Sequence, residues 1–398
     1  MSGKSSKRYS LIIHASHPVQ YHAPLYREIY NKQGIDSMVV YCSDIGVRPL
    51  YQHEFMTTIK WDVSLLDGYN YVISRNYPVN QAGGFFSRVN PGIFRIVKRK
   101  KYDAILIQGY DNFSCWIAFI AAKISRIKII WRGEATLRAH EIPPPWKKWL
   151  KRLILLRFFR ACDAVMYSCS GNKEYLEYYG VPEYKLFPLP CAVDNAYFQN
   201  ERKRYLDKRS DILEGLGIDR GDLVVLFSAR FTSRKRPHDL LEAVNKLGHK
   251  DVTVLFVGDG IEKNSMESYA LKHNIKAVFV GFQNQSELAK FYSIADIATV
   301  ISDYDPSPKA MNEAMNFELP IIVTDIVGTA KDLVKHGENG FVVKVGDTDS
   351  IAAHIEYFYK DRGEVRRMGK KSLEIVGDWN FSEDAGWIEK AVQSVMGD

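Results

Sequence analysis

The sequence contains no long apolar run. Its longest uninterrupted apolar stretch, residues 115–122, is far shorter than the about 20 residues that a membrane-spanning helix needs. The basic opening MSGKSSKRYS leads into the stretch LIIHAS, which is too short for the apolar core of a signal peptide. We therefore expect a cytoplasmic protein, either free in solution or peripheral on the inner face of a membrane.

Cysteine is also scarce. The chain has five cysteines, and no two of them have the spacing of a metal-binding pair: Cys42, Cys115, Cys162, Cys169 and Cys191. An odd number of scattered cysteines in apolar or mixed surroundings is typical of a reduced protein. We therefore expect neither disulfides nor a cysteine-based metal site.

The length and the charge distribution indicate two different halves. A chain of 398 residues is too long for a single hydrophobic core, so two domains are expected. Residues 1–200 carry 27 Lys and Arg against 15 Asp and Glu, whereas residues 201–398 carry 27 against 32. The basic first half favours an anionic partner. We expect no nucleic acid, because no recognition motif accompanies the charge.

Strand and helix patterns alternate along both halves. This alternation predicts an α/β protein with mainly parallel sheets and helices on both faces. The most weakly patterned and most highly charged connection, residues 200–222, is the expected linker, which gives domains of 1–200 and 201–379. The expected strands are 10–16, 37–43, 103–108, 127–131, 163–167 and 185–189 in the first half, and 223–228, 252–257, 277–280, 297–301, 319–324 and 341–345 in the second.

Glycine is missing from the first turn between a strand and a helix, HASHPVQYHAPLYREI, where a dinucleotide-binding fold carries its glycine-rich loop. His17, Gln20 and Tyr21 instead place polar groups beyond the end of the strand. Arg132 and Glu134 directly follow another expected strand. These residues are candidates for contact with a substrate. The alternatives are a helix cap with solvated histidines at the first position and a surface ion pair at the second.

Residues 146–153, WKKWLKRL, have an amphipathic helical pattern. Lysine and arginine side chains fall on one side of the helix, and Trp146, Trp149, Leu150 and Leu153 fall on another. Such a helix is suited to the interface of an anionic membrane surface. The alternative is an ordinary packed helix with a solvated charged face. Beyond Leu153 the pattern is apolar nearly all round, so that part is expected to be buried.

The second half places charged residues after three of its strands. Arg230 and Lys235 follow the first strand, beside a helix that begins near Pro237, and together they predict an anion site. Gly258 lies in a glycine-rich turn after the next strand. Ser286, after the third, is the expected cap of the helix that follows it.

Residues 297–326 are the most informative stretch. An apolar strand ends in a polar turn with Asp305, and Glu313 lies eight positions later in a short helix. In open parallel sheets, ligands bind beyond the carboxyl ends of the strands. Asp303 and Asp305 also have the DxD spacing of some metal-dependent transferases, but a single DxD is a weak signal, and the Arg230 and Lys235 cations already supply positive charge.

The order of these motifs resembles glycosyltransferase family 4. The resemblance rests on Arg-x4-Lys after a strand, then VGDG, GFQNQSELAKFYSIAD, two carboxylates eight positions apart, LPIIVTDIVGTAKDLV and HGENGFVV. HPVQYHAPLYRE, RGE and SGNKEYLEYYGVP extend it into the first half. It implies the GT-B fold, in which two Rossmann-like domains face each other across a cleft, with a terminal helix, here about 380–398, packing back on the first domain.

The resemblance further implies a retaining transferase that uses a nucleotide-sugar co-substrate, without a metal or another cofactor. Arg230 and Lys235 would neutralise the donor diphosphate, and Glu313 would bind the ribose hydroxyls. Asp305 occupies the position, usually Glu, that binds the donor sugar. Further donor-binding candidates are Gly258, Phe282, Ser307, Lys309 and Ala310; the acceptor-side candidates are His17, Gln20, Tyr21, Arg132 and Glu134.

Two departures from the family pattern bear on donor choice. Asp305 is one methylene shorter than Glu, and Pro308, which has no N–H, stands where the family usually has Gly. No base is evident, which fits the family's front-face mechanism, in which a donor phosphate oxygen takes the acceptor proton. The expected acceptor is a saccharide or a lipid-linked saccharide. The alternatives are a sugar-nucleotide epimerase or hydrolase of the same fold, and a nucleotide-sugar binder without catalysis.

Overall fold

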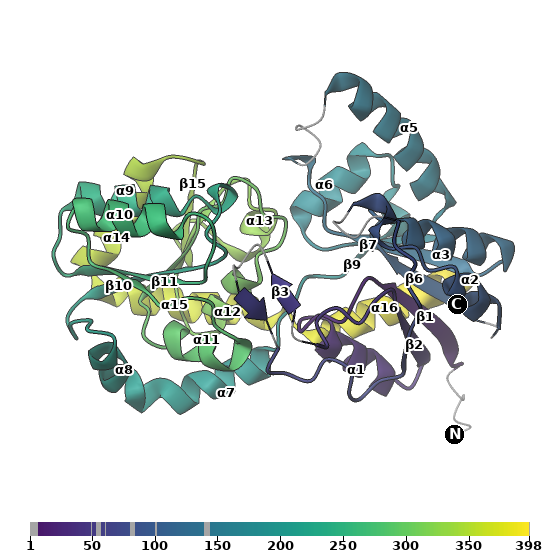
Figure 1. The fold of residues 1–398 in the computed structure, drawn as a ribbon, viewed down its shortest axis with the longest axis horizontal. Helices are drawn as coiled ribbons and strands as arrows, with labels where there is room; N and C mark the ends of the chain where they lie inside the picture. The colour runs from purple at the N-terminus through teal and green to yellow at the C-terminus, as the bar shows by residue number, and fades with distance from the viewer. Residues whose placement is uncertain are drawn as a thin grey trace. The chain divides into compact units, whose positions relative to one another are not determined.

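The computed structural model describes residues 7–48, 50–52, 57–59, 61–79, 84–99, 102–138 and 144–397. The chain forms two compact units. The first comprises residues 1–50, 63–191 and 381–398, and the second comprises residues 51–62 and 192–380. Each unit has its own sheet (Figure 1). Each also has its own hydrophobic core.

The first unit is built on a parallel sheet of seven strands in the order β5-β2-β1-β6-β7-β8-β9. Its strands are β1 (Tyr9–Ala15), β2 (Ile35–Tyr41), β5 (Tyr71–Ile73), β6 (Ala104–Gln108), β7 (Lys128–Gly133), β8 (Ala164–Tyr167) and β9 (Leu186–Pro188). Its helices are α1 (Ala23–Asn31), α2 (Gly92–Arg99), α3 (Phe113–Ile124), α5 (Pro145–Ala161), α6 (Ser170–Tyr178) and α16 (Phe381–Met396). The terminal helix α16 packs against α1, β7 and β9.

The second unit is built on a parallel sheet of six strands in the order β12-β11-β10-β13-β14-β15. Its strands are β10 (Leu223–Ser228), β11 (Val252–Val257), β12 (Ala277–Phe279), β13 (Ile297–Val300), β14 (Ile321–Thr324) and β15 (Gly340–Val343). Its helices are α7 (Asn195–Tyr205), α8 (Arg209–Gly215), α9 (Pro237–Leu247), α10 (Lys263–Lys272), α11 (Gln285–Tyr292), α12 (Lys309–Asn316), α13 (Ala330–Leu333), α14 (Thr348–Lys360) and α15 (Arg362–Gly377). Helices α9, α10 and α14 contribute to the core on one face of this sheet (Figure 1).

Both sheets have the strand order of a Rossmann fold. Numbered along each sheet's own part of the chain, the strands run 3-2-1-4-5-6, with one further strand, β9, at the end of the first sheet. The order reverses between β1 and β6 in the first unit and between β10 and β13 in the second. Loops leaving these neighbouring strands in opposite directions open a crevice at the carboxyl edge of the sheet, where such folds bind ligands.

The twelve strands expected from the sequence are all present, within a few residues of their predicted bounds. Three short strands were not expected: β5 at the edge of the first sheet, and β3 (Leu50–Gln52) and β4 (Thr57–Ile59), which pair with each other. Each of the three is only three residues long and lies outside the regular alternation of strand and helix patterns from which the other strands were predicted.

Two expectations about helices had different outcomes. Residues 200–222 are not an extended linker, because helices α7 and α8 occupy most of that stretch, and the units divide between Cys191 and Ala192. The second half of α5 is buried as predicted, with Leu155, Phe158 and Phe159 in the core of the first unit.

Within the described residues, no helix is both long and apolar enough to cross a membrane.

Candidate active site

The charged residues predicted to bind the donor come together at the carboxyl edge of the second sheet. Arg230 lies two residues beyond the end of β10, and Lys235 lies in a short 3-10 turn, Ser233–Lys235, before α9. Asp305 lies in the turn between β13 and α12. Because β10 and β13 are the strands between which the strand order reverses, these side chains border the crevice expected at that point.

Lys235 and Asp305 form an ion pair in which Lys235 Nζ donates to Asp305 Oδ2. Both side chains are largely buried, with exposed fractions of 15% and 10%. Burial and the neighbouring charge of Arg234 lower the pKa of Arg230, while Asp305 opposes that shift. Lys235 and Arg230 therefore both interact with Asp305, and Arg234 adds a third positive charge beside Arg230, an arrangement suited to a diphosphate.

Glu313 is held by the core of the second unit. Its carboxylate is almost completely buried, and Oε2 accepts a hydrogen bond of 2.7 Å from the hydroxyl of Tyr292 in α11. Ser228 Oγ, at the end of β10, lies 3.3 Å from the same hydroxyl. A carboxylate fixed in this way is oriented before a ligand arrives, which suits the recognition of sugar hydroxyls.

The first turn of α12 supplies the backbone amides of Lys309 and Ala310. These amides have no carbonyl four residues earlier within the helix, as at every helix N-terminus. Pro308 is the residue before the helix, so its missing N–H removes one donor. Lys309 Nζ lies 3.3 Å from Ser307 Oγ and adds a positive charge to this turn.

Gly258 allows two loops of the second unit to approach each other closely. Its φ is +138°, and a Cβ atom there would lie 1.9 Å from the carbonyl oxygen of Ala229. A side chain at this position would push the turn after β11 away from the segment that carries Arg230. The predicted importance of the glycine therefore has a steric basis, which is separate from any contact with a ligand.

Phe282 contacts a segment that is distant in the sequence. Its ring and that of Trp61 are arranged edge to face, with centroids 6.4 Å apart. The carboxylate of Asp62 accepts hydrogen bonds from the backbone N–H and the hydroxyl of Ser286 at the start of α11. The prediction that Ser286 caps α11 is wrong: Asn284 is the N-cap residue, without a side-chain hydrogen bond, and Asp62 serves the first turn instead.

The acceptor-side candidates at the first turn lie at the carboxyl edge of the first sheet. Ser16 Oγ and His17 Nδ1 are 2.9 Å apart, and burial together with the charge of Arg88 lowers the pKa of His17 to about 4. Gln20 is buried, and its Oε1 has no hydrogen-bond partner among the described residues. Tyr21 is partly buried beside it. His17 is therefore a neutral hydrogen-bonding group at neutral pH.

Arg132 and Glu134 do not form the surface ion pair considered above, because Arg132 is 6% exposed. Its Nη2 lies 3.2 Å from Glu134 Oε1 and 3.0 Å from Cys191 Sγ. Burial opposes its charge, but Cys191, Glu134 and Asp384 outweigh burial and raise its pKa. Asp384 belongs to α16, so Arg132 also interacts with the helix that returns to the first unit.

Several residues that contact the candidate donor site could not be identified from sequence. Arg234 lies near Arg230, and its guanidinium lies 5.8 Å from the ring centroid of Tyr304. Tyr292 orients Glu313 from a position 21 residues earlier. In the sequence, Tyr292 stands out only as part of a helical pattern of apolar residues. An ordinary core residue has the same pattern. Trp61 and Asp62 carry no local signal at all.

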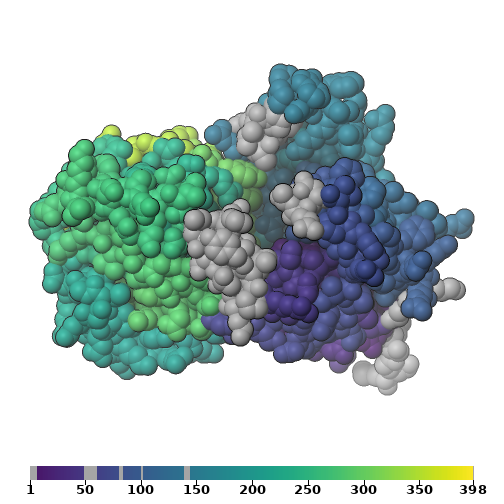
Figure 2. All heavy atoms as spheres, viewed as in Figure 1, coloured from purple at the N-terminus to yellow at the C-terminus, as the bar shows by residue number. Residues whose placement is uncertain are grey.

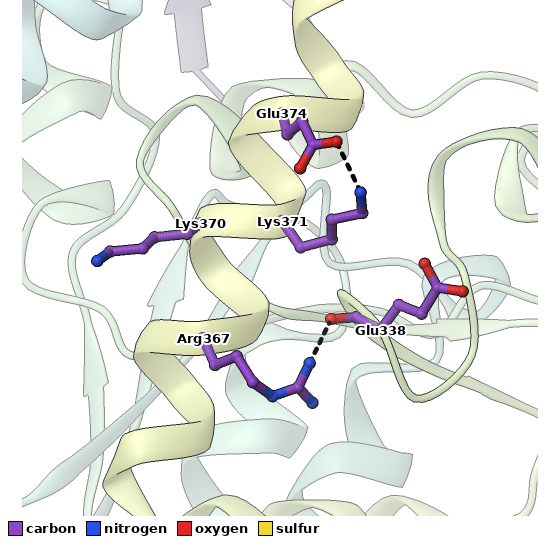
Figure 3. A pocket seen from close by; sticks show the side chains of 5 residues that line it. All are labelled: Glu338, Arg367, Lys370, Lys371 and Glu374. Carbon is purple, nitrogen blue, oxygen red and sulfur yellow. Dashed lines mark hydrogen bonds and ion pairs between the residues drawn. The ribbon is translucent and has the colours of Figure 1, made fainter.

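A surface pocket of the second unit lies away from these residues (Figure 3). It is lined by Glu338 and four residues of α15: Arg367, Lys370, Lys371 and Glu374. Figure 3 shows Lys371 paired with Glu374 and Arg367 directed at the Glu338 carbonyl, while Lys370 points away. Because most of its charges are already satisfied, it is the weaker candidate. No group of three or more potential metal ligands occurs in the described ranges.

Comparison with known proteins gives two family matches, one in each half. Residues 208–374 match the model for glycosyl transferases group 1, and residues 30–197 match the model for Glycosyltransferase Family 4. The structure resembles Anabaena HepE in complex with UDP and glucose, with a TM-score of 0.73 and 16% identity over 97% of this chain and 100% of that chain. Together with the two Rossmann-like sheets, this likeness confirms the predicted GT-B fold.

The relatives found by sequence are also glycosyltransferases, but they match only part of this chain. An uncharacterized glycosyltransferase of Methanocaldococcus jannaschii is 25% identical over 249 residues, which are 61% of this chain and 63% of the relative. An α-1,4-N-acetyl-D-galactosaminyltransferase of Campylobacter jejuni, named for an acceptor saccharide on PP-undecaprenol, is 25% identical over 72% of this chain and 74% of the relative. The match thus spans less than two thirds of the first relative's length.

Proposed function

Because this chain belongs to glycosyltransferase family 4, we propose that it transfers a sugar from a nucleotide-sugar donor to a hydroxyl group of a saccharide or lipid-linked acceptor. The product would be part of a polysaccharide, an O-antigen or a glycolipid. The observation that carries the proposal is the cluster of Arg230, Lys235 and Asp305 at the switch point of the second sheet, with Glu313 fixed nearby.

The cluster matches the charge changes of such a transfer. As the bond between the anomeric carbon and the diphosphate breaks, negative charge grows on the leaving phosphate, and Arg230 and Lys235 stabilise it most strongly at that moment. Asp305 and Glu313 bind hydroxyls of the sugar and the ribose. The acceptor oxygen bonds to the anomeric carbon on the face that the phosphate leaves, and its proton passes to the departing phosphate oxygen, so that the anomeric configuration is retained.

The relatives support the same choice of substrates. HepE was crystallised with UDP and glucose, which makes a uridine-diphosphate sugar the first donor to test. The Campylobacter enzyme is named for an acceptor on a diphosphate lipid. The basic first half of this chain, with 27 Lys and Arg against 15 Asp and Glu, is suited to an acceptor of that charge.

A thermal-shift screen with UDP-, GDP- and ADP-sugars tests the donor site. One of these three classes of nucleotide sugar should raise the melting temperature of the protein. The substitutions Arg230→Ala and Glu313→Ala should each remove that increase. Arg204→Ala is the matched control, because Arg204 lies on α7 and pairs with Glu201 at the surface. A shift that persists in both site variants would contradict the assignment.

Turnover distinguishes the transferase from its two rivals. Release of the nucleoside diphosphate that requires an acceptor supports transfer, whereas release in water alone indicates a hydrolase. Binding without any turnover indicates a catalytically inactive binder. NMR of the product's anomeric proton reports retention or inversion. Activity that survives EDTA supports catalysis without a metal.

Helix α5 supports a peripheral contact with an anionic membrane. Helix α5 lies at the surface in the space-filling view (Figure 2). Trp146 and Trp149 are 64% and 66% exposed, and Leu150 is 46% exposed, so apolar side chains face solvent at the beginning of the helix. Lys147 lies over the ring of Trp146. Lys151 and Arg152, expected on the same charged face, lie instead over tyrosine rings of α6 and the adjoining turn, which leaves Lys147 and Lys148 as the cations nearest this surface.

Vesicle sedimentation tests this contact. The protein should bind vesicles that contain phosphatidylglycerol and bind neutral phosphatidylcholine vesicles less, because both the tryptophans and the lysines contribute. Trp146→Ala/Trp149→Ala and Lys147→Glu/Lys148→Glu should each weaken binding. Tyr184→Ala removes a 77% exposed aromatic elsewhere on the same unit and should have no effect. Unchanged binding in both double variants would refute the contact.

A further inference from the structure

Arg88 is a cation of the first unit that forms no ion pair with any of the residues that the structure describes. Its side chain is partly buried, and none of the hydrogen bonds or ion pairs in the described ranges involves its guanidinium. Asp111 lies at the same edge of the sheet, but its Oδ1 accepts a hydrogen bond from Asn112 Nδ2 at 3.1 Å. A partly buried cation without a counter-charge is unfavourable unless a ligand supplies one.

The backbone that carries Arg88 is held rigidly. Its carbonyl accepts a hydrogen bond from the N–H of Ser114 in the first turn of α3. The buried Asn90 donates from Nδ2 to the carbonyls of Cys42 and Ser74, which follow β2 and β5, and accepts from Ser114 Oγ. Asn76 bonds the segment on both sides, through the Ser87 carbonyl and the Val89 N–H. Arg88 is therefore presented from a fixed position at the carboxyl edge of the sheet.

The polar groups near Arg88 add donors without adding charge. The guanidinium and burial together lower the pKa values of His14 and His17 to about 4, with burial the larger effect. Both rings are therefore neutral at neutral pH. His14 is 1% exposed, its Nε2 lies 3.2 Å from Cys42 Sγ, and its Nδ1 has no partner among the described residues. An incoming anion at Arg88 would thus meet its positive charge and two neutral imidazoles. The negative charge nearest to them at this edge is Asp111, which forms no ion pair with Arg88.

Beside this cation lies an exposed group of aromatic rings, Phe85, Phe86 and Phe113. Their exposed fractions are 39%, 49% and 36%, and their centroids are 5.0 to 6.0 Å apart. Phe85 and Phe86 are the third and second residues before Arg88, and Phe113 precedes Ser114, which bonds the Arg88 carbonyl. Three clustered rings left in water have a free-energy cost that an apolar ligand would remove.

We propose that Arg88 and this aromatic group form a binding site for a phosphate ester on an apolar chain, in which Arg88 binds the phosphate and the phenylalanine rings bind the chain. The proposal rests on the proposed function in one respect: it makes the acceptor a lipid phosphate or diphosphate that bears the sugar to be extended. The guanidinium forms two parallel hydrogen bonds to phosphate oxygens, and the rings contact the first carbons of the chain.

Binding experiments test the two halves of the site separately. Geranyl diphosphate and inorganic pyrophosphate are titrated into the UDP-saturated protein, so that the donor site is occupied. Geranyl diphosphate should bind about 10-fold or more tightly than pyrophosphate. Arg88→Gln should weaken both ligands about 10-fold or more, whereas Phe86→Ala should weaken geranyl diphosphate and leave pyrophosphate unaffected.

Arg95→Gln is the matched control, because Arg95 is an exposed arginine on α2 of the same unit. Lysophosphatidic acid replaces geranyl diphosphate to distinguish a membrane phospholipid from a diphosphate carrier. Binding of either ligand supports the site if the Arg88→Gln substitution weakens that binding. Equal affinity for pyrophosphate and geranyl diphosphate, or unchanged binding in Arg88→Gln, would overturn the proposal.

Failure of this site and failure of the proposed function can be told apart. Binding of geranyl diphosphate requires no sugar transfer, so a protein that binds it through Arg88 but turns over no nucleotide sugar contradicts only the transferase. A protein that transfers sugar, but whose kcat/KM ratio between a diphosphate-linked and a neutral acceptor is unaltered by Arg88→Gln, contradicts only the lipid-phosphate site.

Discussion

The hydroxyl of Tyr292 donates a hydrogen bond of 2.7 Å to Glu313 Oε2, and both side chains are at most 2% exposed. The two residues lie on adjacent helices, α11 and α12, that lead into and out of β13. A buried carboxylate needs such partners to remain both charged and oriented. Glu313 thus depends on a residue outside the motif that identifies it.

Tyr292→Phe should therefore impair both stability and donor binding. Removing a hydrogen bond to a buried charged group should cost about 1.5–3 kcal/mol of unfolding free energy. The KM for the donor should rise because Glu313 is no longer held in one orientation. Tyr359→Phe removes a tyrosine–carboxylate bond at the surface, to Asp251, and should change neither quantity. Chemical denaturation and donor kinetics measure the difference; equal effects of the two variants would contradict the role given to Tyr292.

Asp305→Asn should lower the rate of transfer by about 100-fold or more. The substitution keeps the shape of the side chain but removes the charge that pairs with Lys235 and the acceptor for sugar hydroxyls. Asp325→Asn is the control, since Asp325 makes a comparable but exposed pair with Lys344. Asp305→Glu introduces the residue usual in the family and tests whether the shorter side chain determines donor choice, which competition between UDP-sugars would report. Wild-type turnover in Asp305→Asn would exclude Asp305 from the site.

Gly258→Ala should destabilise the second unit by several kcal/mol, on the order of 2–4, because the new methyl group would overlap the Ala229 carbonyl and the backbone is in a region that only glycine adopts readily. Gly221→Ala is the control, because nothing lies within 4 Å of a Cβ atom there. Thermal denaturation measures both variants. A Gly258→Ala protein as stable as Gly221→Ala would mean that the two loops can separate without cost.

The stability of the first unit should fall as the pH falls from 6.5 to 4. His14 has a pKa of about 4 in the folded protein, chiefly because of burial, and 6.5 when exposed, so the unfolded chain binds a proton over this range that the folded chain does not. The difference corresponds to roughly 3 kcal/mol for this group. His14→Leu should reduce the dependence without abolishing it, because His17 has a similarly lowered pKa, as measured by urea denaturation at a series of pH values. A slope unchanged by the substitution would show that His14 does not titrate in this way.

The alternation of strands and helices, and the motifs at the strand ends, were predictable because they depend on local patterns. Twelve strands were expected and found, since each has four or more apolar residues in succession or a turn signal beside it. Arg230, Lys235, Asp305 and Glu313 were recognisable because the spacing of residues around a strand end determines what that end can bind. The short strands β3, β4 and β5 and the true position of the division between the units have no such local signal.

The sequence by itself therefore determined the two Rossmann-like sheets and predicted which residues form the candidate donor site, because backbone periodicity and turn chemistry act over a few neighbouring residues. Only the tertiary structure decided which side chains support or complete those motifs. It joined Tyr292 to Glu313 and Asp62 to Ser286, buried Arg132, and left Arg88 without an ion pair among the described residues, beside three exposed phenylalanines. Most of these relationships join residues far apart in the chain. They arise only when the chain packs and charged groups are buried next to one another.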